Sequence, residues 1–225
     1  MGDNATYLEW PQRVRIEAER LLRQSPQCHG WDHTVRVWRN ARRLAQAEAA
    51  DSVVAECAAL LHDIGRADED ASHGGTCHAE AGARRVPSIL RAIGVEDAGF
   101  VRRVAECVRT HRYRRSKGQR PATLEAKVVY DADKLDSMGA IGIARSFHFA
   151  GRIGARVHNR AQEALAAESY SVDDTGYREF LVKLRHLKGE MLTREGRRMA
   201  EQRHRFMAAF FERLQEETGD QEPSS

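Results

Sequence analysis

The 225-residue sequence predicts a single all-α domain. Three observations favour this fold class. Apolar residues recur at helical spacing along nearly the whole chain, strand-like alternation is never longer than a few residues, and no internal repeat is present. Hydrophobic residues make up 41% and charged residues 31%, which is typical of a soluble, helix-rich protein. No run of eighteen apolar residues occurs, so we expect no transmembrane span and no membrane partner.

The first third of the chain carries three helical patterns. Residues 11–23 alternate apolar and charged positions at helical spacing, before QSPQCHG interrupts the pattern. The segment 31–50 places four apolar residues on one helix face. Asp51 has the residue type of an N-cap for the next helix, whose apolar stripe runs to Ile64. Gly65 is then the expected stop.

The rest of the chain alternates polar segments with helical ones. RADEDASHGGTC (66–77) is polar and contains glycine, so it predicts a loop, and the polar segment 154–175 predicts a flexible insertion. Further helices are expected over 78–93, 96–111, 122–136, 138–150 and about 193–217, with a basic loop at 114–121. The predicted domain covers 1–218, with a core at about 28–137, C-terminal helices at 138–218 and a disordered tail at 219–225.

The spacing of the cysteines and the composition of the first residues favour a cytoplasmic location. Four cysteines lie far apart without a Cys-x-x-Cys pair, and Cys57 and Cys107 fall within apolar helical patterns. Small buried thiols of this kind indicate a reducing environment, so we expect a cytoplasmic protein. The first residues, MGDNATYLEWPQR, lack the basic-then-apolar layout of a secretory signal, which agrees with this expectation.

Charge is unevenly distributed. The net charge of +3 is too small to indicate nucleic-acid binding by itself, so nucleic acid is not an expected partner. Between Arg102 and Arg120, however, there are eight Lys or Arg residues and one acid, Glu106. This basic stretch is either a field that attracts polyanions or a solvated helix face and loop, and the sequence leaves both open.

Histidines and aspartates gather at predicted helix ends. The clearest pair is His62–Asp63 in LLHDIG, and His33, His78 and His111 lie in comparable places. Histidine and carboxylate are the usual ligands for divalent first-row metals when cysteine is not used. Read alone, the pair also fits a helix-capping histidine beside a solvated aspartate. The apolar run before it and the other candidates favour a metal site.

Helix geometry separates the aspartates of DADKLD (131–136). Asp131 and Asp133 would point about 200° apart around a helix, so one buried site is not expected to use both. Asp133 and Asp136 share a face, and Asp133 lies at the margin of the apolar stripe. We therefore expect Asp133 as a metal ligand and Asp136 as a residue supporting it. The alternative is a solvated acidic face paired with Lys134.

The ordered set His33, His62–Asp63 and Asp133 resembles the H…HD…D signature of the HD-domain metal-dependent phosphohydrolases. Further stretches are similar to bacterial HD hydrolases of the YedJ/YpgQ type over nearly the whole chain. These stretches are WDHTVRV (31–37), AALLHDIGR (58–66), HAEAGA (78–83), DADKLDSMGAIGIAR (131–145) and LTREGRRMAEQRHRFMAAFFERL (192–214).

The resemblance implies an all-helical HD-domain bundle with a metal held between helices by four ligands: His33, His62, Asp63 and Asp133. It also implies Mn²⁺ or Mg²⁺, although Co²⁺, Ni²⁺, Fe²⁺ and Zn²⁺ also suit these ligand types. Some HD relatives bind two metals through extra histidines, which makes His78 and His111 candidates for a second site. This chain reads HRYRR where relatives often have HS, so the role of the neighbourhood of His111 stays open.

The implied activity is hydrolysis of a phosphate ester or anhydride, with a nucleotide, nucleoside triphosphates included, as the expected substrate. A metal lowers the pKa of its bound water and clamps the phosphate. Asp63 is expected to orient that water or to accept its proton. Lys134, next to a proposed ligand, is expected to meet a phosphate oxygen.

Three other functions stay open at this point. They are a non-catalytic HD domain that senses a nucleotide, a two-metal oxygenase on the same scaffold, and a basic helical protein whose nucleic-acid binding depends steeply on salt. The complete ligand set favours an enzyme over a sensor. The sequence does not identify the substrate or the native metal, and it leaves the oligomeric state, including a homodimer, open.

The remaining candidates receive structural interpretations. Trp31 and Trp38 share a helix face and are expected in the core, and Arg145 either touches substrate or forms a buried salt bridge. The other histidines are expected to be structural or incidental: His29, His73, His148, His158, His186 and His204.

Overall fold

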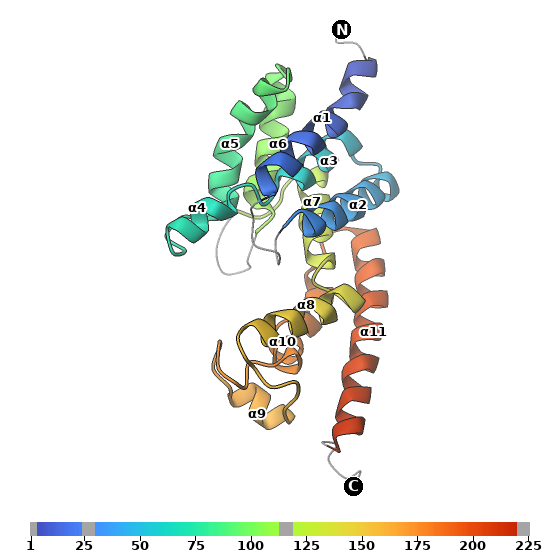
Figure 1. The fold of residues 1–225 in the computed structure, drawn as a ribbon. Coiled ribbons are helices and arrows are strands. Elements are labelled where there is room, and N and C mark those ends of the chain that lie inside the picture. Colours follow the sequence, from blue (N-terminus) through green and yellow to red (C-terminus); the bar gives the residue numbers. More distant parts are fainter. Residues whose placement is uncertain (1–3, 24–29, 113–118, 220–225) are drawn as a thin grey trace. The chain divides into compact units, whose positions relative to one another are not determined.

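The computed structural model describes residues 4–23, 30–112 and 119–219, and every regular element in these ranges is a helix (Figure 1). The all-α prediction is therefore confirmed. No helix in these ranges is long and apolar enough to cross a membrane. The elements are α1 (Asn4–Leu22), α2 (Trp31–Glu48), α3 (Ser52–Leu61), α4 (Arg66–Ala71), α5 (His78–Ala92), α6 (Ala98–Thr110), α7 (Leu124–Leu135), α8 (Gly139–Arg152), α9 (Ala161–Ala166), α10 (Gly176–Val182), the 3₁₀ helix η2 (Leu184–Glu190) and α11 (Arg194–Thr218).

The chain forms two compact units. The first comprises Met1–Asp133 with Leu192–Gly196, and the second comprises Lys134–Met191 with Arg197–Ser225. Helices α7 and α11 each begin in the first unit and continue into the second. The single domain expected over residues 1–218 stays a prediction.

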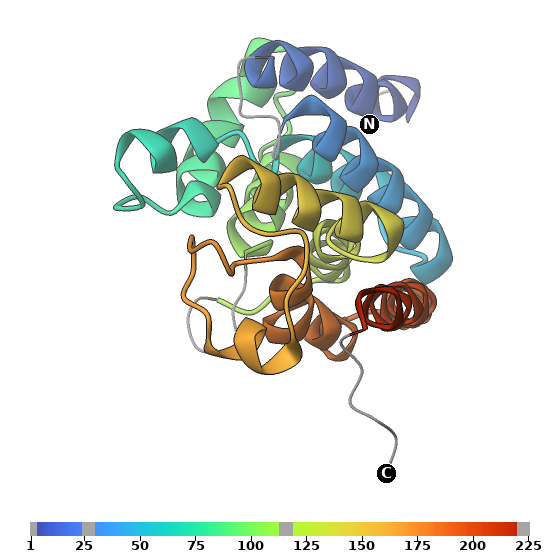
Figure 2. The ribbon, with the colours of Figure 1, turned by 60° about the horizontal axis from the view of Figure 1, so that its bottom comes forward.

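Helix α3 is the central helix of the first unit. The Asp51 carboxylate accepts hydrogen bonds from the backbone nitrogens of Val53 and Val54, at 3.1 and 3.3 Å, and so caps the helix as predicted. Eight of the ten residues of α3 are buried, because α1, α2 and α6 pack against it (Figures 1 and 2). The apolar run before His62 is therefore a core helix whose C-terminal end is fixed in place.

The helices around α3 follow their sequence patterns. Helix α2 buries the predicted apolar face, and Trp31 and Trp38 pack against the core as expected. Asp97 caps α6, and α5 lies alongside α6 (Figure 1). The thiol of Cys107, on α6, is buried, as is that of Cys57 on α3.

Several expectations for the segments between helices are wrong. The first helix begins at Asn4, well before residue 11. The segment 66–77 begins with α4, whose first turn carries acidic residues that favour a helix N-terminus, and is not a loop throughout. The segment 154–175 contains α9, and its Asn159 side chain bonds to Asp173 O and to the Thr175 hydroxyl, so it is held in place by hydrogen bonds.

Two other predictions concern residues outside the described ranges. Most of the basic loop 114–121 lies in the gap at 113–118, and all of the predicted tail except Gly219 follows the last described residue. Helix α10 and η2 were not predicted, because both are short.

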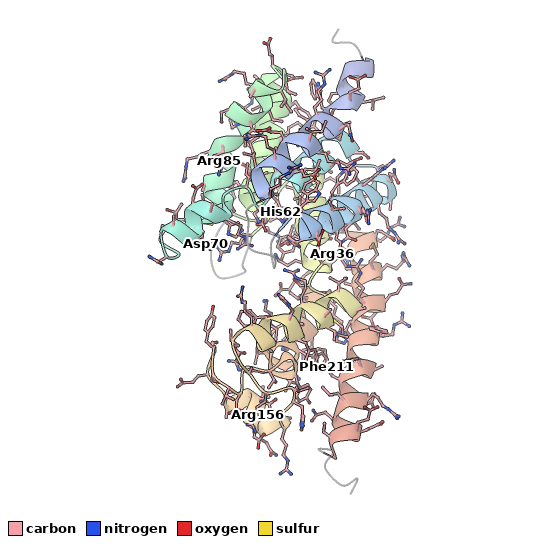
Figure 3. All side chains as sticks on the ribbon, in the orientation of Figure 1. Arg36, His62, Asp70, Arg85, Arg156 and Phe211 are labelled. Atoms are coloured by element: carbon pink, nitrogen blue, oxygen red, sulfur yellow. The ribbon has the colours of Figure 1, made fainter. Side chains whose placement is uncertain are left out.

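The second unit is built around aromatic rings. Phe180 of α10 stacks on Phe211 of α11 with ring centroids 4.6 Å apart, and Phe147 of α8 also stacks on Phe211. Figure 3 labels Phe211 on α11. Phe211 is almost completely buried. Burial of such large apolar side chains, together with their stacking, stabilises this unit.

Asp131 connects distant parts of the first unit. Its carboxylate accepts hydrogen bonds from the backbone nitrogens of Leu192 and Thr193, both at 2.8 Å, and from the Thr193 hydroxyl at 2.6 Å. The same hydroxyl oxygen accepts a hydrogen bond from Gly196 N and so caps the start of α11. This structural role agrees with the expectation that Asp131 and Asp133 do not serve one site.

The close approach at residue 196 leads to a stability prediction. A Cβ on Gly196 would lie 2.2 Å from Asp131 Oδ2 and 2.6 Å from Thr193 Oγ1. We expect Gly196→Ala to lower the free energy of unfolding by about 1–3 kcal/mol, as overpacking of a tight site typically does. Urea unfolding measures this change. The control is Gly151→Ala on α8, where a Cβ meets open space; equal stability of both variants would contradict the prediction.

Candidate metal centre

Two helices of the first unit end in histidines that are held in the same way. His62 follows α3 with its Nδ1 2.7 Å from Ala59 O, and His111 follows α6 with its Nδ1 2.6 Å from Val108 O. A carbonyl oxygen can only accept, so each Nδ1 donates a proton. Each ring thereby satisfies a carbonyl that the helix end leaves without an intrahelical partner. The Nε2 atoms face the interior of the cluster.

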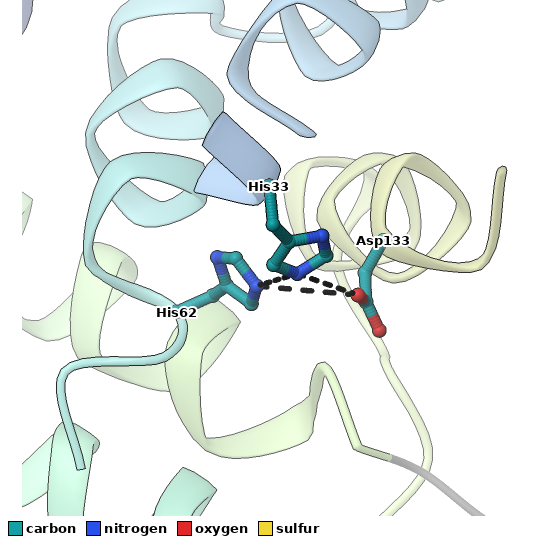
Figure 4. Close-up of side chains that lie close together, drawn as sticks. All are labelled: His33, His62 and Asp133. Carbon is teal, nitrogen blue, oxygen red and sulfur yellow. Dashed lines mark hydrogen bonds and ion pairs between the residues drawn. The ribbon is translucent and has the colours of Figure 1, made fainter. Parts of the chain in front are cut away.

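His62 belongs to a first group with His33 and Asp133, which Figure 4 shows converging from α2, the end of α3 and α7. His33 Nε2 lies 3.1 Å from His62 Nε2. Asp133 Oδ1 lies 3.5 Å from His33 Nε2 and 3.9 Å from His62 Nε2. Ligand atoms of the three residues all lie within 4.8 Å of one another, so one cation could contact all three.

His111 belongs to a second group with His78 and Asp63. His78 is the first residue of α5, and its Nε2 lies 3.2 Å from His111 Nε2. Asp63 Oδ1 lies 3.4 Å from His78 Nε2 and 3.7 Å from His111 Nε2. These ligand atoms also lie within 4.8 Å of one another, and all three residues are buried.

The carboxylate of Asp63 stands between the two groups and is completely buried. Its Oδ2 lies 3.4 Å from His62 Nε2 and 3.6 Å from His33 Nε2, on the side of the first group. Its Oδ1 faces the second group and also accepts a hydrogen bond from Arg66 Nε at 3.0 Å. One carboxylate therefore faces imidazoles of both groups.

Burial and charge set the protonation of the cluster. Burial lowers the pKa of His78 to about 3, and burial also lowers the pKa of His111. Burial acts on His62 in the same direction, but the charge of Asp63 outweighs it and raises the pKa of His62. Burial would raise the pKa of Asp63, yet the charges of His62 and of the Arg66 guanidinium hold it well below its ordinary range. Asp63 is therefore an anion, and His78 and His111 are neutral.

These observations fit a divalent cation. Among the described residues, no donor makes a hydrogen bond to the buried Asp63 Oδ2, and an unsatisfied buried carboxylate oxygen is costly. His78 and His111 are neutral rings with Nδ1 engaged, so their Nε2 lone pairs face each other at 3.2 Å. A cation would satisfy these atoms, and imidazole and carboxylate ligands suit first-row divalent metals.

The predicted ligands therefore come together, while three other candidates stand differently. Asp136 is buried and paired with Arg145 at 2.9 Å, which agrees with the salt-bridge interpretation of Arg145. Lys134 follows Asp133 on α7 and is half-buried. Lys134 and Asp136 belong to the second unit, so their roles at the site stay predictions.

The remaining histidines that the structure describes are not part of the cluster, and several arginines of the basic stretch form ion pairs. His73, His148, His158 and His186 are exposed, His204 is half-buried, and His29 lies outside the described residues. Three arginines of the basic stretch form ion pairs, Arg103 with Asp51, Arg109 with Glu106 and Arg112 with Glu69. Its attraction of polyanions stays a prediction.

The sequence interpretation missed residues that surround the second group. Glu69 on α4 lies 2.7 Å from His78 Nδ1 through its Oε2, and both Arg66 and Arg112 donate to this carboxylate. The i,i+3 pair of Arg66 and Glu69 is a helical signal within the segment that was expected to be a loop.

Gly65 allows α5 to approach the His62–Asp63 pair. A Cβ at this position would lie 2.2 Å from His78 O and 2.6 Å from Gly82 N, both backbone atoms. The expectation that Gly65 ends the helix is wrong, because α3 ends at Leu61 and Gly65 is the N-cap residue of α4. Gly65 instead lets the N-terminus of α5 carry His78 into the cluster.

Comparisons with known proteins identify the family of this chain. Residues 30–138 match the HD domain family. The chain is also 31% identical over 210 residues to uncharacterized protein YpgQ of Bacillus subtilis (strain 168), covering 93% of this chain and 94% of that protein. The chain belongs to the HD-domain family. The similarity to YpgQ extends well beyond the segment 30–138.

Solved structures of HD-domain proteins are similar over nearly the whole length. The crystal structure of Bacillus subtilis YpgQ has a TM-score of 0.71 at 30% identity and covers 94% of this chain and 97% of that chain. YpgQ in complex with ADP gives 0.70 at 29% identity over 94% and 96%. An HD-superfamily hydrolase from Bacillus thuringiensis gives 0.72 at 28% identity over 96% and 100%. This HD-domain protein therefore has the fold of the HD-superfamily hydrolases.

The contact at Gly65 leads to a prediction for this HD-domain protein. We expect Gly65→Ala to lower the free energy of unfolding by about 1–3 kcal/mol, because backbone atoms of α5 must move to admit the methyl group. Chemical denaturation measures this loss. Gly189→Ala, where a Cβ meets open space, is the matched control. A Gly65→Ala protein as stable as the Gly189→Ala protein would show that the close contact is unimportant.

Proposed function

We propose that this HD-domain protein is a metal-dependent phosphohydrolase that cleaves a phosphate ester or anhydride, with a nucleotide, nucleoside triphosphates included, as its substrate. The observation that carries the proposal is the buried Asp63 carboxylate, which faces imidazole nitrogens on both sides. The proposal of a nucleotide is supported by YpgQ, whose structure has been solved with ADP.

The proposed ligands divide into two sets. His33, His62, Asp63 and Asp133 hold the first divalent ion, Mn²⁺ or Mg²⁺ in the first instance, with Co²⁺, Ni²⁺, Fe²⁺ and Zn²⁺ as metals that the same ligands accept. His78 and His111, together with the other oxygen of Asp63, hold a second ion. When bound, such an ion lowers the pKa of a water molecule and offsets negative charge on the phosphate oxygens.

The protein residues position the reactants. Asp63 Oδ1 accepts a hydrogen bond from Arg66 and faces His78, while Oδ2 faces His62 and His33 and accepts no hydrogen bond from the described residues. We therefore assign Asp63 to orienting the attacking water or accepting its proton. Lys134, adjacent to Asp133 in the sequence, is the proposed contact for a phosphate oxygen.

The free thiols bear on the compartment in which the protein acts. We propose that the reaction takes place in the cytoplasm, where free thiols such as those of Cys57, Cys77 and Cys107 stay reduced. The substrate is a small phosphorylated molecule, and no nucleic acid is required as a partner.

The other functions predict different experimental results. A nucleotide sensor would bind a nucleotide without releasing phosphate, and an oxygenase would need iron and dioxygen for turnover. A nucleic-acid-binding protein would keep its affinity after replacement of His62 and Asp63 and would lose it steeply as salt rises.

The first functional prediction concerns Asp63. In a screen of nucleotides and phosphoesters with Mn²⁺, Mg²⁺, Co²⁺ and Ni²⁺, we expect phosphate release by the wild-type protein. We expect the rate of phosphate release to fall by at least about 100-fold in Asp63→Ala and Asp63→Asn. Replacing residues that only support metal ligands already lowers metal affinity or activity about 10–100-fold. Asp70→Asn, on the exposed end of α4 (Figure 3), is the control.

Two outcomes would contradict the hydrolase proposal. One is the absence of phosphate release from every substrate with every metal, and the other is full activity in the Asp63 variants. Asp63→Asn keeps the shape of the side chain, so its circular dichroism spectrum and unfolding midpoint separate loss of activity from loss of fold.

The second functional prediction concerns the number of ions. Equilibrium dialysis against Mn²⁺ followed by elemental analysis should give two ions per wild-type chain and one per chain of the double variant His78→Gln/His111→Gln, because the second group loses both imidazoles. The double variant His148→Gln/His186→Gln, in which both original histidines are exposed, should keep two. Equal metal content in all three proteins would count against a second ion.

A further inference from the structure

Helix α4 places a carboxylate behind the second group of histidines. Glu69 Oε2 lies 2.7 Å from His78 Nδ1, on the side of the ring opposite the cluster, and the Glu69 side chain is only 14% exposed. A carboxylate accepts hydrogen bonds and cannot donate one, so this contact requires a proton on His78 Nδ1.

A neighbouring arginine offers the opposite arrangement. Arg112 Nη1 lies 3.2 Å from His78 Nδ1 and could donate only to a ring nitrogen without a proton. The carboxylate contact is the shorter of the two, at 2.7 Å, and Arg112 Nη1 already has Glu69 Oε1 as its acceptor. The geometry therefore favours the tautomer of His78 with the proton on Nδ1.

This tautomer determines what His78 presents to the cluster. In the neutral ring, the proton on Nδ1 leaves Nε2 with a lone pair. Nε2 lies 3.2 Å from His111 Nε2 and 3.4 Å from Asp63 Oδ1. In the other tautomer, a hydrogen on Nε2 would fill the space between these atoms and His78 could not act as a ligand.

We infer that Glu69 is a positioning residue that fixes the tautomer of His78 and so prepares the His78, His111 and Asp63 group for a divalent cation. This inference rests on the second ion of the proposed function. It assigns to Glu69 the part that a carboxylate commonly plays behind a metal-binding histidine.

Two arginines hold Glu69 in this position. Arg66 donates from Nη1 to Glu69 Oε2 at 3.2 Å and from Nε to Asp63 Oδ1 at 3.0 Å, so a single guanidinium orients both carboxylates. Arg112 donates to Glu69 Oε1. Arg66, in the first turn of α4, thus links the Asp63 carboxylate, which faces the histidines, to the Glu69 carboxylate behind His78.

The test compares three variants with the wild-type protein. Glu69→Leu removes the acceptor at similar size, Glu69→Gln keeps an oxygen that can accept from His78 Nδ1, and Asp68→Asn is the control. Asp68 is an exposed residue of the same helix and pairs with Arg85 at the surface. Side-chain ¹⁵N NMR of the metal-free proteins reports the histidine tautomers, and Mn²⁺ titration reports the affinity of each ion.

We expect the His78 proton on Nδ1 in the wild-type, Glu69→Gln and Asp68→Asn proteins, and partly or wholly on Nε2 in Glu69→Leu. We expect the second Mn²⁺ to bind about 10–100-fold more weakly to Glu69→Leu, with the first unchanged. If Glu69→Leu does not fold, the wild-type spectrum and the titration of Glu69→Gln still decide the matter.

Different results overturn different parts. A proton on Nε2 of His78 in the wild-type protein overturns the inference, as does a Glu69→Leu protein that keeps both the Nδ1 proton and the affinity for the second ion. A wild-type protein with the Nδ1 proton but only one bound Mn²⁺ overturns the second ion of the proposed function and leaves the tautomer assignment to Glu69 in place.

Discussion

A carboxylate that water cannot reach must be compensated by positive charge or by hydrogen-bond donors, and the Asp63 side chain imposes this requirement on the centre of the first unit. An ion moved out of water without compensation costs several kcal/mol even after the protein relaxes. Arg66 supplies one donor, and imidazoles from α2, α3, α5 and α6 face the two oxygens. The packing of α2 and α6 on α3, and of α5 on α6, brings these side chains to one carboxylate.

The histidines at the ends of α3 and α6 show that a helix cap and a ligand need not be alternatives. In His62 and His111 the Nδ1 atom bonds to a carbonyl three residues earlier, which fixes the ring, while Nε2 faces the cluster. Read from the sequence, the His62–Asp63 pair allowed a capping histidine beside a solvated aspartate. The histidine does cap its helix, but the aspartate is buried, and the same ring serves both purposes.

The sequence predicted the features that depend on local patterns and residue types. The N-cap at Asp51 and the amphipathic face of α2 follow from spacing alone, and the resemblance brought His33, His62, Asp63 and Asp133 together with His78 and His111 as candidates. Helix α4 was missed because its six residues, four of them charged and two of them alanine, show no apolar periodicity. Glu69 was missed with it, since its importance comes from a contact with His78 across a turn, which no spacing rule anticipates.

The hydrogen bonds of Asp131 have a consequence for how this chain could be divided. The segment that matches the HD domain ends at residue 138, yet three donors to the buried Asp131 carboxylate come from Leu192 and Thr193, more than fifty residues later. A fragment cut at residue 138 would keep the carboxylate and lose these donors. The part of the sequence that marks the family therefore does not contain all the partners of its own buried groups, because a short stretch of backbone just before α11 supplies the donors to Asp131.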